Sequence, residues 1–337
     1  MTVPIETDVA IVGAGPAGLF AVFELGMLKL TSVLIDALAE PGGQCAALYP
    51  EKPIYDIPAH PAIDAGALID ALERQIAPFA PRRLLGERVT ELAGTAGAFR
   101  LRTDQGGEVH AKAVVIAAGA GAFGPNRPPL PGLAAYEATG AVRYLVRARE
   151  SLRGRRVVIA GGGDSAVDWA LALKDIAQVA VVHRRPHFRA APESAAALKA
   201  AAAQGEVELV IPYQLAALHG TNGTLAAVEV ATLAGETRAL PADVLLAFFG
   251  LAAELGPIAG WGIALDQHRV RIDPATCETS VPGVFAIGDV VSYPGKLKLI
   301  LQGFSEAAMA AHAIWRAVHP GQALHFEYST TQGVPAG

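Results

Sequence analysis

Short runs of consecutive apolar residues, each followed by a glycine-rich or polar turn, are the main feature of the hydrophobic pattern. Two such runs occupy residues 9–12 and 33–35, and an apolar stretch of helical length separates them. Strands that are apolar at every position are typical of parallel sheets buried on both faces. The pattern predicts a βαβ unit over about residues 7–36, and a second that starts near Arg155 and ends at Val182.

The elements that follow these units recur in the same order in both halves. An alternating segment with a Gly-Gly pair near its end predicts a hairpin over residues 99–110, and a buried strand follows at 113–118. The second half repeats this order with a hairpin at 225–240 and a strand at 244–249. We therefore interpret the halves as copies of one architecture, the second inserted into the first. Further predicted elements are helices at 64–77, 164–175, 192–204 and 301–315 and a strand at 284–289.

Each βαβ unit has a glycine-rich loop after its first strand, Gly13-Ala-Gly-Pro-Ala-Gly18 and Gly161-Gly-Gly-Asp-Ser-Ala166. The first glycine makes the turn, the second lets the backbone approach a pyrophosphate, and the third small residue lets helix and strand pack closely. The following helix directs free N–H groups and its positive end toward the phosphates. The candidate binding residues are Gly13, Gly15, Pro16 and Gly18 in the first loop and Gly161, Gly163, Asp164, Ser165 and Ala166 in the second.

The residues at the end of the second strand differ between the units. Asp36 stands 23 residues after Gly13, where a carboxylate accepts hydrogen bonds from the two hydroxyls of a ribose. The second unit has His183-Arg-Arg185 at the matching place, and Arg189 follows. Guanidinium groups bind a ribose 2'-phosphate, which a carboxylate would repel. The alternative is a solvated basic turn. The difference predicts two dinucleotides, a flavin in the first unit and NADPH in the second.

The expected fold class is therefore α/β, with two Rossmann-like, three-layer dinucleotide-binding domains. The NADP-binding domain, residues 119–250, is expected to be inserted into an FAD-binding domain of residues 1–118 and 251–337. A proline-rich segment at residues 125–131 marks the first crossing between them.

Composition excludes several other classes of protein. The chain is 52% hydrophobic and 18% charged, with a net charge of −5, and it lacks the basic block expected of a nucleic-acid or membrane-surface protein. No segment reaches the ~18 apolar residues of a membrane-spanning helix. The first residues lack the features of a signal peptide, so we expect a cytoplasmic protein without membrane or nucleic-acid partners.

The two cysteines, Cys45 and Cys277, form no C-x-x-C or C-x4-C pair. Cys45 stands where some disulfide-reducing flavoenzymes carry the first of two cysteines, but the position of the second is Pro50. A buried and inert thiol is the expected state of Cys45. No Ser/His/Asp arrangement or metal-ligand spacing is found among the remaining residues, and the nine histidines are scattered.

These motifs together resemble the thioredoxin-reductase-like ferredoxin (or flavodoxin)–NADP+ reductases over nearly the whole chain. The Tyr49-Pro-Glu-Lys52 loop and the missing dithiol are the specific parts of the resemblance, whereas the glycine loops are shared by many flavoproteins. The segments that carry it are residues 42–56, 121–125, 161–170, 183–190, 286–289 and 328–330.

The resemblance implies a role for further residues toward FAD. It implies that Asp36 holds the adenosine ribose and that Asp289 binds a ribityl or ribose hydroxyl. The other FAD contacts that it implies are Gln44 and Tyr49 along the flavin, the backbone of Val89 at the adenine, Phe123 near the cofactor, and Tyr328, Ser329 and Thr330 over the isoalloxazine. Members of the family differ in the aromatic residue at the position of Tyr328. The terminal segment can come from the other subunit, which implies a homodimer.

The implied activity is ferredoxin–NADP+ reduction: hydride transfer between NADPH and N5 of FAD, and one-electron exchange with ferredoxin or flavodoxin. One alternative is a thioredoxin-reductase-type disulfide reductase, which needs a C-x-x-C before the second glycine loop, yet residues 140–149 contain no cysteine. Another alternative is a non-catalytic flavoprotein that responds to NADP. The sequence leaves the natural acceptor and the direction of electron flow open.

Overall fold

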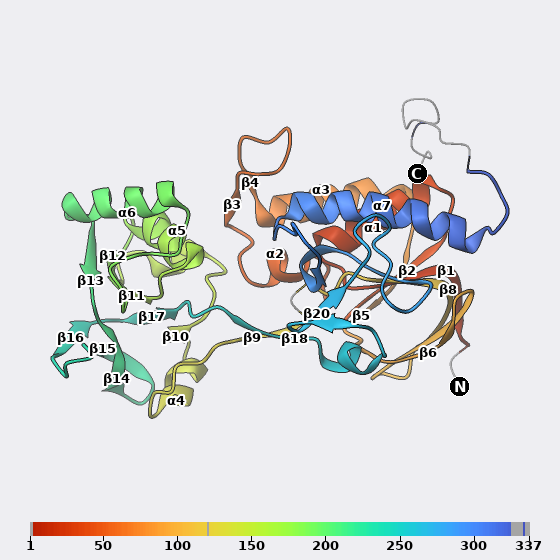
Figure 1. Cartoon of the computed structure of the whole chain (residues 1–337). Helices are drawn as coiled ribbons and strands as arrows, with labels where there is room; N and C mark the ends of the chain where they lie inside the picture. The colour runs from red at the N-terminus through yellow and green to blue at the C-terminus, as the bar shows by residue number, and fades with distance from the viewer. Residues whose placement is uncertain (1–2, 120, 325–332, 334–337) are drawn as a thin grey trace. The chain divides into compact units, whose positions relative to one another are not determined.

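The computed structural model describes residues 3–119, 121–324 and 333, and gives the backbone alone for 122–125 and 251–253. The chain divides into two compact units (Figure 1). Unit 1 consists of Met1–Phe123 and Ala253–Gly337, and unit 2 of Gly124–Ala252. The chain leaves unit 1 within β9 (Ala122–Pro125) and returns within β18 (Leu251–Glu254), and these two strands pair with each other.

Unit 1 is built on a mixed seven-stranded sheet in the order β5-β2-β1-β8-β7-β6, with β21 paired to β8. The strands β5, β2, β1, β8 and β21 run parallel, and β7 and β6 continue the sheet in antiparallel fashion. The bounds are β1 Ile5–Val12, β2 Ser32–Asp36, β5 Arg82–Leu85, β6 Val89–Thr95, β7 Ala98–Thr103, β8 Glu108–Ile116 and β21 Val284–Ala286.

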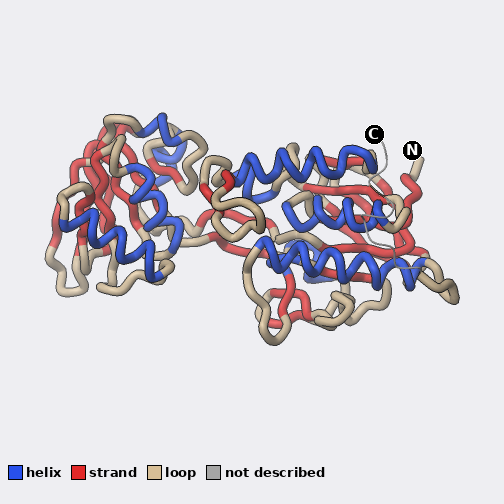
Figure 2. Tube along the Cα trace, turned by 90° about the horizontal axis from the view of Figure 1, so that it is seen from above, coloured by secondary structure: helices blue, strands red, loops and turns tan. Residues whose placement is uncertain are grey.

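Alternate residues of the central strands enter two different cores. Val9 and Ile11 of β1 pack into the core beneath the helices, whereas Ala10, between them, packs into the core on the opposite face. Three helices cover the first of these faces and lie along the strands (Figures 1 and 2): α1 (Pro16–Met27), α3 (Ala65–Ile76) and α7 (Ile300–Val318). The uniformly apolar strands are explained by this burial on both faces.

Unit 2 contains a parallel five-stranded sheet in the order β10-β17-β11-β12-β13 and a separate antiparallel sheet of β14, β15 and β16. Residues of β11 and β17 alternate between two cores, as residues of β1 do in unit 1. The bounds are β10 Val142–Arg143, β11 Arg156–Ala160, α5 Asp164–Leu173, β12 Gln178–Val182, α6 Pro192–Ala203, β13 Val207–Val210, β14 Gln214–Thr221, β15 Thr224–Ala231, β16 Thr237–Pro241 and β17 Val244–Ala247.

Short elements complete the two units. They are α2 Gly43–Ala47, β3 Pro53–Ile54, β4 Ile63–Asp64, α4 Leu133–Ala138, β19 Leu265–Asp266, β20 Arg269–Arg271, β22 Val291–Ser292 and the 3-10 helices η1 Ala77–Phe79, η2 Arg149–Leu152, η3 Gly256–Gly260 and η4 Gly288–Val290. None of the helices in the described part of the chain is long and apolar enough to span a membrane.

The two-domain Rossmann-like fold class is confirmed, but several element predictions are wrong in detail. The expected hairpin strand and buried strand of the first half are one continuous strand, β8, because no turn residue interrupts it. The strand predicted to reach residue 289 ends at Ala286, because Gly288 has a φ of +78° and begins η4. The strand predicted at 244–249 ends at Ala247 and the helix predicted at 164–175 ends at Leu173. β6 and β14 were not predicted.

Candidate functional site

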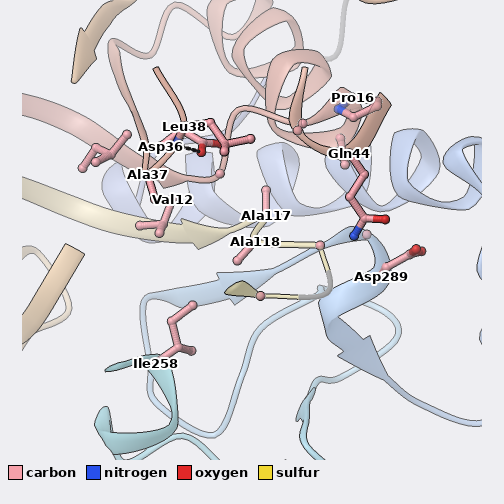
Figure 3. A pocket seen from close by; sticks show the side chains of 18 of the residues that line it. Val12, Pro16, Asp36, Ala37, Leu38, Gln44, Ala117, Ala118, Ile258 and Asp289 are labelled. Atoms are coloured by element: carbon pink, nitrogen blue, oxygen red, sulfur yellow. Dashed lines mark hydrogen bonds between the residues drawn. The ribbon is translucent and has the colours of Figure 1, made fainter. Parts of the chain in front are cut away.

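A cavity of about 340 Å³ opens in unit 1 beyond the carboxyl ends of β1, β2 and β8. Ligands of open parallel sheets bind at this edge. Its wall combines the first glycine loop, the end of β2, α2, η3, η4 and the start of α7. Figure 3 shows Asp36 and Asp289 at separate places on this wall, with Gln44 near Asp289.

The glycines of the first loop have distinct local environments. A Cβ atom on Gly13 would lie 2.3 Å from the carbonyl oxygen of Ala117, and one on Gly18 would lie 1.9 Å from the carbonyl oxygen of Gly13. A larger residue at position 13 would clash with the backbone that follows β8, and one at position 18 would push α1 away from the glycine loop. Gly15 has no atom within 4 Å of a Cβ position and lines the cavity, as does Pro16, the first residue of α1. The loop thus leaves room for a close backbone approach by a ligand.

Asp36, the last residue of β2, lies at the edge of the cavity with its carboxylate held by two backbone amides. Oδ2 accepts a hydrogen bond of 2.6 Å from the N–H of Ala14, and Oδ1 accepts one of 2.8 Å from the N–H of Leu38. Burial raises the pKa of the carboxyl group, and the two hydrogen bonds oppose this rise. Each oxygen retains a lone pair that can accept a hydrogen bond from a hydroxyl group of a ligand.

Gln44, Tyr49 and Asp289 line another part of the cavity. Cys45 is 3% exposed, and burial raises the pKa of its thiol to about 11, although a hydrogen bond with Tyr49 acts in the opposite direction. Burial also raises the pKa of the Tyr49 phenol, and the nearby charge of Asp289 adds to the rise. Both groups are therefore neutral near pH 7, so Cys45 lacks the thiolate that thiol chemistry requires.

Five further residues were expected near the flavin: Val89, Phe123, Tyr328, Ser329 and Thr330. Val89, the first residue of β6, lines the cavity. Phe123 is described by its backbone alone, and Tyr328, Ser329 and Thr330 lie outside the described residues.

Sequence reasoning missed part of the cavity wall. Among the residues concerned are Arg88, Leu255, Pro257, Ile258, Leu299, Ile300 and Gly303. One signal was available in the sequence, namely a glycine inside an apolar helix. A Cβ on Gly303 would lie 3.1 Å from the Cβ of Ala17, so this glycine allows α7 to approach α1.

In unit 2 the second glycine loop joins β11 to α5. A Cβ on Gly161 would lie 2.6 Å from the carbonyl oxygen of Phe248, whereas Gly163 has nothing within 4 Å of its Cβ position. Ala166 is fully buried and packs against Gly161, and Ser165 is exposed. Asp164, at the start of α5, is joined to the residue before α6, because its Oδ1 accepts a 2.8 Å hydrogen bond from the N–H of Ala191. The tightly packed position of Gly161 and the open position of Gly163 repeat those of Gly13 and Gly15 in the first loop.

His183 is a buried part of the basic turn. Its ring lies against Gly162, stacks on Phe188 with the ring centroids 5.2 Å apart, and has Nε2 3.2 Å from the carbonyl oxygen of His187. Burial lowers the pKa of His183, and the positive charges of Arg184, Arg189 and Arg185 lower it further. The histidine therefore organises the turn as a neutral ring.

The three arginines of this turn are exposed. The N–H of Arg189 donates a 2.7 Å hydrogen bond to the carbonyl oxygen of Gly162, which ties the turn to the glycine loop. No side-chain ion pair or hydrogen bond of Arg184, Arg185 or Arg189 is found among the described residues. Three guanidinium groups beside an open glycine loop suit an anionic ligand. Within the described ranges, no cluster of His, Cys, Asp and Glu could hold a metal ion.

The family model described as "Pyridine nucleotide-disulphide oxidoreductase" matches residues 7–314. The chain belongs to the pyridine nucleotide-disulphide oxidoreductase family. This oxidoreductase is 72% identical over 336 residues to a protein named ferredoxin–NADP reductase from Acidiphilium cryptum, with 99% of each chain covered. It is 73% identical over 332 residues to the protein of the same name from Granulibacter bethesdensis, covering 98% of this chain and 95% of the relative. The expected resemblance is thus confirmed.

Solved structures place the fold of this family member beside thioredoxin reductases. The crystal structure of T. acidophilum thioredoxin reductase aligns with a TM-score of 0.80 at 23% identity, covering 92% of this chain and 98% of that one. The Lactococcus lactis thioredoxin reductase also aligns with a TM-score of 0.80 at 23% identity, covering 93% of this chain and 99% of that one. At this identity the likeness establishes the fold and carries no statement about the substrate.

Proposed function

We propose that the protein is an FAD-dependent ferredoxin (or flavodoxin)–NADP+ oxidoreductase. FAD occupies the cavity of unit 1 and NADP(H) binds at the second glycine loop of unit 2. The observation that carries the proposal is the contrast between the two strand ends: an anchored carboxylate at Asp36 and exposed guanidiniums at Arg184 and Arg185.

The cavity of unit 1 fits FAD in its sequence of chemical groups. Asp36 offers acceptors for a ribose diol, and the Gly15 backbone and the start of α1 suit a pyrophosphate. Gln44, Tyr49 and Asp289 supply an amide, an aromatic ring and a carboxylate where the ribityl chain and the isoalloxazine would lie. Val89 and Phe123 are proposed contacts toward the adenine side and the cofactor, and Tyr328, Ser329 and Thr330 a proposed cap.

The chemistry that a bound FAD supplies is hydride acceptance at N5 and release of electrons in single steps. The protein's residues bind and orient the two dinucleotides and exclude water. The arginines of unit 2 select the 2'-phosphate, and Gly163 with the start of α5 accommodates the pyrophosphate. No side chain is required as a nucleophile or a general acid.

Two buried thiols argue against a disulfide reductase. The chain has two cysteines in all, and both are free and buried. Burial raises the pKa of Cys45 to about 11 and that of Cys277 to about 12. Disulfide exchange needs an accessible thiolate and a resolving thiol. A one-electron protein partner is therefore the better match, and we propose ferredoxin or flavodoxin, as the names of the relatives suggest. We also propose that the active form is a homodimer.

The proposal is tested by anaerobic titration of the purified protein with NADPH, followed by addition of oxidised ferredoxin. We expect NADPH to bleach the flavin absorbance and ferredoxin to restore it while becoming reduced. Bleaching that no ferredoxin or flavodoxin reverses would favour a non-catalytic NADP-responsive flavoprotein. Reversal by a disulfide substrate alone would favour the disulfide reductase.

A further inference from the structure

Behind the cavity wall lies a buried ion pair that the proposed mechanism does not use. Nζ of Lys296 is 2.5 Å from Oε1 of Glu306, and the two side chains are 5% and 2% exposed. Neither side chain lines the cavity. Removing two charges from water is costly, and apolar side chains of similar volume often stabilise a protein equally well or better. The pair therefore invites an explanation beyond stability.

The carboxylate of Glu306 accepts hydrogen bonds from three different groups. Oε2 accepts from the backbone N–H of Gly288 at 2.7 Å, and Oε1 accepts from Lys296 and from the hydroxyl of Tyr293 at 2.6 Å. The Tyr293 oxygen in turn accepts from Nε2 of Gln302 at 2.7 Å. Burial is the main cause that raises the pKa of the Tyr293 phenol, and Glu306 adds to it. The phenol therefore remains a donor near neutral pH.

Gly288 connects this network to the cavity. Gly288 and Asp289 line the cavity as the first residues of η4, and Gly288 adopts a φ of +78°. Such a turn places the side chain of Asp289, so the hydrogen bond that holds Gly288 also determines where the Asp289 carboxylate points. Gly303, one turn before Glu306 on α7, also lines the cavity, and its Cβ position lies 3.4 Å from the Cα of Gly288.

We propose that Glu306 is a positioning residue for FAD binding: it holds the Gly288–Asp289 turn against the cavity, and Lys296 supplies the counter-charge that this buried carboxylate needs. The inference rests on the proposed function, because FAD is the ligand of the cavity. Lys296 also directs Glu306, since it attracts Oε1 and leaves Oε2 for the N–H of Gly288.

The proposal separates the acceptor for Gly288 from the charge of the pair. K296M/E306Q and K296M/E306L both lack the buried charges, so each is expected to fold. The glutamine amide oxygen can still accept from the N–H of Gly288, whereas leucine leaves that buried N–H without an acceptor. Tyr293→Phe serves as a control inside the network, because it removes one donor to Glu306 and keeps the Gly288 contact.

The experiment is a calorimetric titration of the flavin-free proteins with FAD. The thermal unfolding of each flavin-free protein is measured in parallel. We expect K296M/E306L to bind FAD at least about tenfold more weakly than K296M/E306Q, the effect of one unsatisfied buried N–H. K296M/E306Q and Tyr293→Phe should bind FAD nearly as tightly as the wild type. Equal FAD affinities for the two double variants would overturn the proposal, even if their unfolding temperatures differed.

The design also distinguishes a failure of this inference from a failure of the proposed function. If the wild-type protein without flavin binds no FAD, the proposed function itself is wrong. If the wild type binds FAD tightly and K296M/E306L does so equally, FAD binding stands and the positioning role of Glu306 is wrong. If K296M/E306L fails to fold, Glu306→Gln is measured against Tyr293→Phe. In Glu306→Gln, Lys296 attracts the amide oxygen and turns the NH2 group toward Gly288, so weaker FAD binding supports the proposal and unchanged binding overturns it.

Discussion

The carboxylate of Asp36 and the backbone amide of Ala14 are joined by a hydrogen bond of 2.6 Å. This bond ties the end of β2 to the middle of the glycine loop that follows β1. The second oxygen is fixed by Leu38, so the acid is oriented before any ligand arrives. A group ordered in advance loses less conformational entropy on binding. Asp36 therefore lines the cavity and also holds the glycine loop in place.

The first prediction concerns the identity of the flavin. The protein should release FAD on denaturation, and Asp36→Asn should bind FAD about tenfold more weakly, since it loses a charged acceptor for the adenosine ribose. FMN has no such ribose, so its binding should weaken less than that of FAD. Asp8→Asn, on the same sheet and outside the FAD cavity, serves as the control. Release of FMN from the wild type would contradict the assignment of Asp36.

The second prediction concerns the preference for NADPH. Arg184→Ala or Arg185→Ala should weaken NADPH binding by about one to two orders of magnitude, because each removes a charge-assisted contact to the 2'-phosphate. NADH lacks that phosphate and should bind as before. Arg153→Ala is the matched control, since Arg153 is exposed and paired with Glu150 in the same unit. An equal loss for both nucleotides would mean that the arginines form a solvated basic turn.

The glycine loops and their neighbours were predictable because their signals are local. Gly13 and Gly161 make turns that the adjacent residues specify, and Asp36 follows directly from its strand. The places of Leu255 and Ile258 in the cavity wall were not predictable, because η3 is far from the first glycine loop in sequence and only the tertiary fold brings it to the cavity. The strands β6 and β14 were missed since their residues are largely exposed or half-buried and lack strong alternation.

The Glu306 network illustrates a different limit. A glutamate on the apolar face of a helix, beside Ala307 and Ala310, was visible in the sequence as an anomaly. Its partner Gly288 begins η4, and Tyr293 and Lys296 lie in the loop after β22, so their positions depend on tertiary packing. The sequence could therefore have drawn attention to Glu306 without assigning its partners.

The third prediction concerns the two faces of the isoalloxazine. Tyr49→Ala should weaken FAD binding and shift the flavin spectrum, because a stacked aromatic pair contributes ~0.5–1.5 kcal/mol beyond area burial. We propose that Tyr49 lies on the face away from the nicotinamide and Tyr328 on the face that NADPH must reach. Deletion of residues 325–337 should then alter the rate of reduction by NADPH. If spectrum, rate and oligomeric state were all unchanged, Tyr328 would have no capping role.

The fourth prediction concerns the pH dependence of stability. Hydrogen bonds that the His110 ring donates to the carboxylates of Glu108 and Glu6 raise the pKa of His110, with Nε2 2.9 Å from Glu108 and Nδ1 2.7 Å from Glu6. A raised pKa in the folded state means that the protonated histidine stabilises the fold below its ordinary pKa of 6.5 and loses this effect as the pH rises through the folded value. The difference in Tm between the wild type and His110→Gln should therefore shrink from about pH 6 to pH 8. A difference that grows with pH would refute the assigned sign.

Electron transfer that needs no thiol is the central claim, and a double variant tests it most directly. Cys45→Ser/Cys277→Ser removes both cysteines of the chain. The measurement is the rate of NADPH-driven ferredoxin reduction per bound flavin, followed anaerobically beside the wild type. The account predicts that the double variant keeps most of the wild-type rate. Loss of ferredoxin reduction in a double variant that still binds its flavin would contradict the account and point to a thiol in the mechanism.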